Sequence, residues 1–498
     1  MKAFLMYRDQ DFDVQRKLPW HEQALTQDLE LTTLIDAMAR GDKFVWDVAC
    51  KAVVLSLDDV DTILYRQDIL KDCVKNAAIV RDLYAIAVEA IESERKVWSF
   101  LRDFPHGILQ RSVEVLELFV ERLKKLKAIA DEHAQEFASA GFTALFAMLT
   151  AELEEEYFAR VKNHLRELRF RGGALISAEL GKGNKGTDYR LRKRPEKKQT
   201  WLERIFARKP PAYTYYIPDR DESGPRYLAE LQDRGINLVA NALAQSTAHI
   251  LSFFTMLRTE LAFYVGCVNL HEQLAQLGEP TCFPVPVAPG GRRHSYRGLY
   301  DVCLALSMKQ KVVGNDEDAD RRDLVMITGA NQGGKSTFLR GIGLAQLMMQ
   351  CGMFAPAEAF CANICEGVFT HYKREEDTTM QSGKFDEELS RMSAIVEHIK
   401  PNAMLLFNES FAATNEREGS EIGRQIVSAL LEKRIKVFYV THLYELAHGF
   451  YDKKMENAVF LRAERQADGG RTFKLIEGEP LQTSYGEDLY KAIFGTDS

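Results

Sequence analysis

The stretch Gly329-Ala330-Asn331-Gln332-Gly333-Gly334-Lys335-Ser336 decides the fold of the C-terminal part of this chain. It fits the pattern G-x-x-x-x-G-K-[ST] and follows an apolar run at 324–328 that is typical of a buried strand. Helix-forming residues without proline then continue to Met349. A strand, a glycine-rich turn and a helix in this order form a P-loop, whose backbone N–H groups surround a β-phosphate. The sequence therefore predicts an α/β nucleotide-binding domain.

This motif also predicts how ATP and Mg²⁺ are bound. Lys335 supplies a cation to the β- and γ-phosphates, and the Ser336 hydroxyl ligates Mg²⁺ at the start of a helix whose dipole favours anions. The other predicted nucleotide contacts within the motif are Gly329, Ala330, Asn331, Gln332, Gly333, Gly334 and Thr337.

Two later apolar runs end in polar residues. Asn408 and Glu409 follow the run at 403–407, and His442 follows the run at 437–441. The order and spacing of these runs after the P-loop place Glu409 and His442 at the ends of strands in the same domain. We therefore predict that Glu409 orients and polarises the attacking water and that His442 senses the γ-phosphate, with Lys335 as the third catalytic residue.

Asn408 is the second predicted metal residue, beside Ser336. It occupies the position at which P-loop ATPases place an aspartate. An amide keeps an oxygen for a Mg²⁺-bound water but lacks the negative charge, so we expect weaker metal binding.

Composition predicts a soluble globular protein. The chain has 498 residues, 46% of them hydrophobic and 28% charged, which predicts two to four domains. No apolar run approaches the roughly 20 residues of a membrane span, and the N-terminus lacks a signal-peptide core, which predicts a cytosolic protein without membrane contact. The eight cysteines are scattered, as reduced buried thiols are, and the spacing of Cys361 and Cys365 favours ordinary thiols over a metal site.

The net charge of −7 means that any nucleic-acid contact must come from a local basic surface. One basic run lies between Lys182 and Lys209, with Tyr189, Trp201 and Phe206 interleaved. Such a run either neutralises phosphates or forms a solvated insertion, and the sequence leaves both open. The predicted nucleic-acid contacts are Arg190, Arg192, Lys193, Arg194, Lys197 and Lys198.

Patterning divides the chain into four segments. Residues 1–168 carry long amphipathic helical patterns, and residues 169–225 form a short basic insertion with some strand, as the alternating run at 213–217 indicates. Residues 226–285 resume helical periodicity as one helix or two, and end in a proline-rich connection at 280–291. Residues 286–498 form the nucleotide-binding domain.

At this point the chain resembles the MutS family of DNA mismatch-repair and recombination ATPases. The resemblance is carried by the motif TGANQGGKSTFLR, the loop at 382–389, Asn408-Glu409 followed by Gly419, the segment THLYEL at 441–446, the run at 483–486 and the Arg-Gln segment at 64–70. It implies an ABC-type P-loop ATPase domain preceded by a mostly α-helical lever domain, with residues 169–225 as a reduced DNA clamp. It also implies a homodimer in which Asn415, at the position of the family's usual serine, reaches the partner's nucleotide.

The departures from the family pattern shape the predicted function. The chain has no room before the helical core for a mismatch-reading domain and no Phe-x-Glu near its start. We therefore expect a dimeric ATPase that couples ATP binding and hydrolysis to DNA binding in repair or recombination, without reading mismatches. Two alternatives stay open: a nucleotide-switched binding module that barely hydrolyses ATP, and an ATPase acting on ribosomes or structured RNA.

Overall fold

The computed structural model describes residues 1–97, 104–170, 173–193, 223–374, 383–466 and 470–481. The chain forms two compact units. The hairpin unit comprises Met1–Ala3, Asp82–Gln135 and Ala144–Arg258, and the sheet unit comprises Phe4–Arg81, Glu136–Thr143 and Thr259–Ser498. The bounds of the four predicted segments are not tested by this division and stay predictions.

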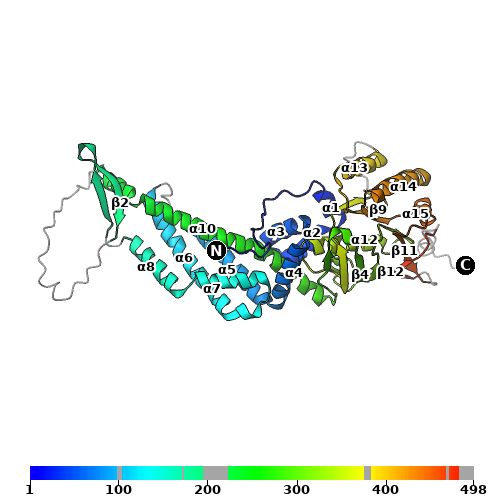
Figure 1. The fold of residues 1–498 in the computed structure, drawn as a ribbon, viewed down its shortest axis with the longest axis horizontal. Coiled ribbons are helices and arrows are strands. Elements are labelled where there is room, and N and C mark those ends of the chain that lie inside the picture. The colour runs from blue at the N-terminus through cyan, green and yellow to red at the C-terminus, as the bar shows by residue number, and fades with distance from the viewer. Residues whose placement is uncertain (98–103, 171–172, 194–222, 375–382, 467–469, 482–498) are drawn as a thin grey trace. The chain divides into compact units, whose positions relative to one another are not determined.

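The hairpin unit is built from long helices and a two-stranded hairpin (Figure 1). Its elements are α6 (Pro105–His133), α8 (Glu155–Leu168), the first part of α10 (Ser223–Gln276), β1 (Leu175–Leu180), η2 (Lys182–Asn184) and β2 (Gly186–Arg192). Pro105 begins α6, where its missing N–H costs no hydrogen bond. Gly235 of α10 lies directly against Ile176 of β1. A Cβ at this glycine would be only 2.5 Å from the isoleucine Cδ1, so a larger residue would force the isoleucine side chain to shift.

Two sequence predictions are refined in this unit. The returning helical pattern forms one helix, α10, which continues into the sheet unit, as α5 (Ala77–Lys96) and α7 (Ala140–Glu152) also pass between the units. The insertion does contain strand, at β1 and β2, whereas the run at 213–217 lies outside the described residues. Among the helices described, α10 alone is long and apolar enough to cross a membrane. However, 67% of its 18-residue apolar segment is buried inside the protein, as in a core helix.

The sheet unit begins with four short helices: α1 (Glu22–Asp28), α2 (Leu31–Ala39), α3 (Lys43–Val54) and α4 (Val60–Lys75). Aspartates begin two of them. The Asp42 carboxylate accepts hydrogen bonds from the N–H groups of Phe44 and Val45, and Asp59 does the same for Thr62. Such caps satisfy N–H groups that have no partner within the helix.

A six-stranded sheet forms the centre of the sheet unit. Its order is β12 (Arg471–Glu477), β11 (Ala458–Arg465), β6 (Leu324–Thr328), β10 (Lys436–Val440), β9 (Met404–Asn408) and β8 (Val368–Tyr372). All neighbours are parallel except β11 and β12. Val440 lies opposite both Ile327 and Asn408, so β6, β10 and β9 end at the same edge.

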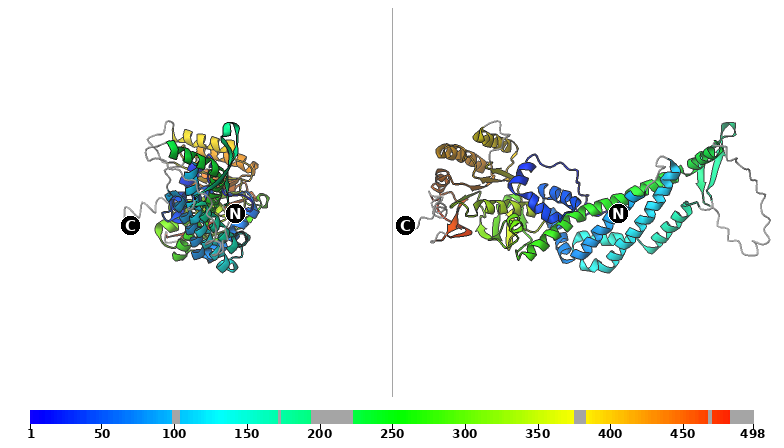
Figure 2. Two further views of the ribbon diagram at one scale, coloured as in Figure 1. Left: turned by 90° about the vertical axis from the view of Figure 1, so that its left-hand side faces the viewer. Right: turned by 180° about the vertical axis from the view of Figure 1, so that it is seen from behind.

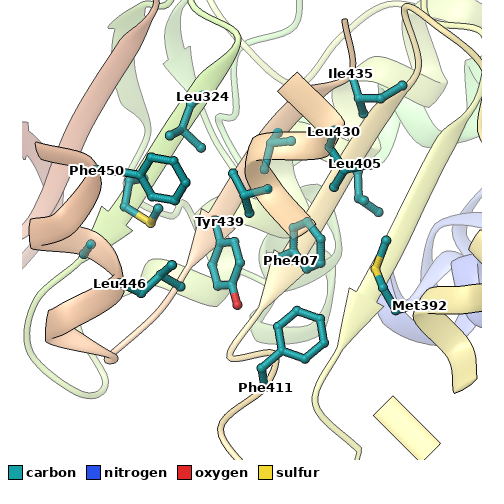
Figure 3. Close-up of a cluster of buried hydrophobic side chains, with 14 of the residues drawn as sticks. Leu324, Met392, Leu405, Phe407, Phe411, Leu430, Ile435, Tyr439, Leu446 and Phe450 are labelled. Carbon is teal, nitrogen blue, oxygen red and sulfur yellow. The ribbon is translucent and has the colours of Figure 1, made fainter. Parts of the chain in front are cut away.

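Helices cover both faces of this sheet (Figures 1 and 2). On one face lies α12 (Lys335–Gln350), which packs closely against β9 at Gly343. A Cβ at this position would be only 2.7 Å from Leu406 Cδ1, so the close packing requires glycine. On the other face lie α13 (Lys384–His398), α14 (Glu416–Glu432) and α15 (Tyr444–Tyr451). Figure 3 shows the apolar cluster beneath these helices, in which the rings of Phe407 and Tyr439 stack 4.7 Å apart. The central strands β6, β9 and β10 are nearly continuous apolar runs, as expected for strands that are buried on both faces.

A second, four-stranded sheet has the order β3 (Val285–Val287), β7 (Ala359–Asn363), β4 (His294–Leu299) and β5 (Asn315–Asp318). The proline-rich stretch at 280–291 is therefore more than the predicted connection, since it contains β3 and the turn η3 (Pro289–Gly291). Strand β3 pairs in parallel with Cys361–Asn363 of β7 at the edge of the sheet. An edge strand tolerates the proline at 286 that a central strand would not.

Candidate nucleotide-binding and catalytic site

The turn between β6 and α12 requires glycine at several positions. Gly329 has φ +110° and Gly334 has φ +88°, conformations that other residues rarely adopt. A Cβ at Gly329 would lie 2.8 Å from the backbone nitrogen of Ala463, and one at Gly333 would lie 2.7 Å from Ala463 Cβ. The turn is thus pressed against β11.

Lys335 lies beneath this turn. Its side-chain Nζ donates hydrogen bonds to the carbonyl oxygens of Gly329 (3.0 Å) and Ala330 (2.9 Å), and only 6% of the residue is exposed. Burial lowers the pKa of Lys335, while the nearby Glu409 carboxylate opposes that shift. An ammonium has three donors, so one N–H remains for an anion after the two carbonyl bonds.

Ser336 and Asn408 meet at the start of α12 and the end of β9. The Ser336 hydroxyl donates to Asn408 Oδ1 over 2.9 Å. Both predicted metal residues therefore present oxygen atoms at one point beside the turn. Oxygen is the ligand that Mg²⁺ prefers, so the pair fits the ion in donor type, although neither group supplies a negative charge.

Glu409 and His442 are brought together from neighbouring strand ends. Glu409 Oε1 lies 3.7 Å from His442 Nδ1, and the Glu409 N–H donates to the Val440 carbonyl over 2.8 Å. The polar contact with His442 lowers the pKa of Glu409, although burial acts in the opposite direction. The carboxylate is therefore held in its ionised form, which a general base needs.

A further cation that the sequence did not indicate lies beside the turn. Arg471, the first residue of β12, donates from Nη1 to Gln332 Oε1 over 2.8 Å. Its charge also contributes to lowering the pKa of Lys335. Lys335 is thus not the only cation at the turn. Arg471 follows no motif, and only the pairing of β12 with β11 places it there.

An apolar cavity of about 410 Å³ adjoins the turn. Three predicted nucleotide contacts, Gln332, Gly334 and Thr337, lie on its wall. Met308, Val313 and Phe473 are among the apolar residues that complete it. A pocket of this size with mostly apolar walls and a few polar groups suits a flat aromatic ring.

Asn415 lies apart from these contacts. It is the N-cap of α14, and its Oδ1 accepts a hydrogen bond from the Glu418 N–H over 3.0 Å. Because the oxygen is occupied, the exposed side chain can offer only its NH₂ group to a phosphate.

The predicted nucleic-acid residues that the structure describes already have side-chain partners within the protein. Arg190 pairs with Asp188 (2.7 Å), Lys193 with Glu167 (3.5 Å), and Arg192 donates from Nε to Ser177 Oγ (2.8 Å). All three are exposed on or directly after β2. Arg194, Lys197 and Lys198 lie outside the described residues. Contact with nucleic acid therefore stays a prediction.

Most cysteines are buried, as the sequence predicted. All eight are free, and six of them are buried. In the part of the chain that the structure describes, no three His, Cys, Asp or Glu side chains gather closely enough to hold a metal ion. Cys361 and Cys365 accordingly belong to no described metal cluster.

The C-terminal domain is thus a layered α/β structure, with a glycine-rich turn, a buried lysine and a carboxylate at one edge of a mainly parallel sheet. Sequence comparison assigns it further: MutS domain V matches residues 325–494, and the MutS2 N-terminal domain matches residues 58–277. The chain belongs to the MutS family.

Curated relatives match over parts of the chain. The DNA mismatch repair protein MutS of Listeria monocytogenes serotype 4a (strain HCC23) is 25% identical over 281 residues, which cover 55% of this chain and 32% of the relative. The DNA mismatch repair protein MutS of Thermus aquaticus is 30% identical over 34% of this chain and 20% of its own length. MutS protein homolog 4 of Mus musculus is 29% identical over 30% of this chain and 16% of its own length. The chain spans about a third or less of each of these relatives.

Proposed function

We propose that this protein is a cytosolic, dimeric P-loop ATPase that couples ATP binding and hydrolysis to DNA binding in repair or recombination, without reading mismatches. One observation carries the proposal: the ends of β6, β9 and β10 bring Lys335, the Ser336–Asn408 pair and the Glu409–His442 pair to one edge of the sheet. Membership of the MutS family supports it.

Phosphate binding is the first step. The N–H groups of the turn and the dipole of α12 favour an anion at the helix start. Lys335 is positioned by two carbonyl oxygens and has one donor to spare, and Arg471 adds a second cation at Gln332. The cavity lined by Met308 and Phe473 takes the base of the nucleotide in this proposal.

Water activation is the second step. Ser336 and Asn408 would hold Mg²⁺, which neutralises phosphate charge when bound. Glu409 accepts a proton from the attacking water, and its lowered pKa keeps the carboxylate available. His442 Nδ1 lies 3.7 Å from Glu409 Oε1. His442 therefore senses the γ-phosphate while it contacts the general base.

Dimerisation is proposed from the position of Asn415. The residue is exposed at the N-terminus of a 17-residue helix. Its NH₂ group and the helix dipole together favour binding of a phosphate of the nucleotide that is bound to a second subunit. Asn415→Ser keeps both a cap and a donor, whereas Asn415→Asp keeps the cap but cannot donate.

The dimer has its own test. A Lys335→Ala subunit mixed with an Asn415→Asp subunit should regain part of the ATPase activity, since one composite site per heterodimer stays intact. Asn415→Ser should retain activity without mixing. A strict monomer in sedimentation with a bound ATP analogue would overturn the dimer.

The polymer partner is tested by steady-state ATPase rates. Rates with duplex DNA, branched DNA and ribosomes are compared with the rate of the protein alone. Stimulation by DNA supports the proposal, and stimulation by ribosomes only favours the RNA-acting alternative. Tight ATP binding with negligible turnover under all conditions favours the nucleotide-switched module, for which the uncharged Asn408 is the specific observation.

A further inference from the structure

The segment that carries Glu409 has an unusual backbone. Glu409 has φ +54° and Phe411 has φ +63°. Residues other than glycine rarely adopt such values, and they persist only where the surroundings hold them. The contacts that hold this segment therefore decide where the Glu409 carboxylate points.

Ser410, between these two residues, is completely buried. Its Oγ lies 2.7 Å from His371 Nδ1 and 2.5 Å from the His371 carbonyl oxygen. Its own carbonyl accepts a hydrogen bond from the Tyr439 hydroxyl over 2.9 Å. Both polar ends of Ser410 are thus fixed to the neighbouring strands β8 and β10.

Glu388 of α13 holds the same segment from the other side. Its Oε2 accepts a hydrogen bond from the Phe411 N–H over 2.8 Å, and its backbone carbonyl lies 2.9 Å from His371 Nε2. The rings of His371 and Phe411 stack 5.3 Å apart. Figure 3 shows Phe411 at the margin of the apolar cluster, and its ring lies 6.2 Å from that of Phe407.

The protonation state of His371 fixes the direction of these bonds. Burial, aided by the charge of Arg391, lowers its pKa to about 4, so the ring is neutral near pH 7. The Glu388 carbonyl can only accept, which assigns the ring proton to Nε2. The single Ser410 hydroxyl proton is then shared between two acceptors, the His371 carbonyl oxygen and Nδ1. His371 therefore links α13 to Ser410 through one ring.

We propose that His371, Ser410 and Glu388 form a positioning clamp that holds the backbone on both sides of Glu409 and so aims its carboxylate. None of the three is a catalytic residue, because each acts through the 409–411 backbone. The inference rests on the proposed function, in which Glu409 is the base.

Glu388 provides the sharpest test, because a clamp and a second catalytic carboxylate respond differently. Glu388→Ala removes the acceptor for Phe411 N–H and should lower kcat roughly tenfold or more, with KM for ATP unchanged, since misplacing a reacting group slows chemistry. Glu388→Gln keeps an acceptor oxygen and should restore most of that loss. A Glu388→Gln enzyme as slow as Glu388→Ala, or a Glu388→Ala enzyme with full kcat, would overturn the clamp.

Ser410→Ala tests the other end and needs a control for damage to the core. It should lower kcat without changing KM. His294→Phe is the matched control, since His294 is also completely buried and packs against Tyr296, Phe360 and Phe438. At comparable losses in melting temperature, only Ser410→Ala should lose kcat. An equal loss in both variants would reduce the effect to general destabilisation and refute the clamp.

Hydrogen–deuterium exchange provides a readout that needs no ATPase activity. In the nucleotide-free protein, Glu388→Ala should accelerate exchange of the Phe411 amide, whereas Glu388→Gln should not. If the parent protein hydrolyses no ATP, the proposed function fails while this exchange still tests the clamp. Unchanged Phe411 exchange in Glu388→Ala would disprove the clamp itself.

Discussion

Two groups of cations in this chain were predicted to meet phosphates, and the structure places them in opposite environments. Lys335 is 6% exposed and held by two carbonyl oxygens, whereas Arg190 and Lys193 are exposed beside the acids Asp188 and Glu167. A buried, positioned cation interacts strongly and is screened little by salt. Exposed ion pairs are weak and screened. Charge density along a sequence therefore says less about phosphate binding than does the position of a single lysine.

The largest effect is expected at the buried cation. Lys335→Ala should lower ATP turnover by about a hundredfold or more, because it removes a positioned donor from the phosphate site. Nucleotide binding and steady-state hydrolysis are measured together. Lys433→Ala, at the exposed C-terminal end of α14, is the matched control. Turnover like that of the parent in Lys335→Ala would mean that the turn does not hold phosphates.

The next largest effect separates binding from chemistry at the same edge. Glu409→Gln should retain ATP while hydrolysis falls roughly a hundredfold, as expected for a general base. The lowered pKa of Glu409 also predicts that parent activity persists on acidification until below the ordinary glutamate value of about 4.3. Glu432→Gln at the end of α14 is the control. Unchanged hydrolysis in Glu409→Gln would move the base to another residue.

Much of the fold could be predicted because its central strands are buried on both faces. The runs at 324–328, 403–407 and 437–441 form β6, β9 and β10 to within a residue or two, and the helix after Lys335 ends at Gln350. Strand β3 could not be predicted, since its pairing with β7 is long-range and a proline stands at its centre. A local pattern of apolar residues therefore predicts strands that are buried on both faces, but it does not predict which strands pair at the edge of a sheet.

The candidate site divides in the same way. Lys335, Ser336, Asn408, Glu409 and His442 could be found because each lies directly at the end of a predicted strand or in the glycine-rich turn. Arg471 and His371 could not, because only the order of strands in the sheet brings them beside Gln332 and Ser410. A neutral buried histidine leaves no pattern in a sequence that separates it from an ordinary core residue.

A moderate effect is expected where the site lacks charge. Asn408→Asp adds a carboxylate 2.9 Å from the Ser336 hydroxyl position and should lower the Mg²⁺ concentration needed for half-maximal hydrolysis, because carboxylates bind this ion more strongly than amides. Asn402→Asp is the control, as it adds the same charge just before the opposite end of β9. A shift of equal size in both variants would assign the effect to general electrostatics.

The smallest effect is expected at the hairpin, where removing an acid and removing a base should act in opposite directions. Asp188→Asn frees Arg190 from its partner, and asparagine tolerates the φ of +50° at this position. Duplex DNA should then bind more tightly and with a steeper salt dependence, whereas Arg190→Gln should weaken binding and flatten the slope of log K by about 0.9 for each lost phosphate contact. Binding is measured over a salt titration for the parent and both variants. If all three share one affinity and one slope, Arg190 contacts no phosphate, and the hairpin charges are solvated rather than functional.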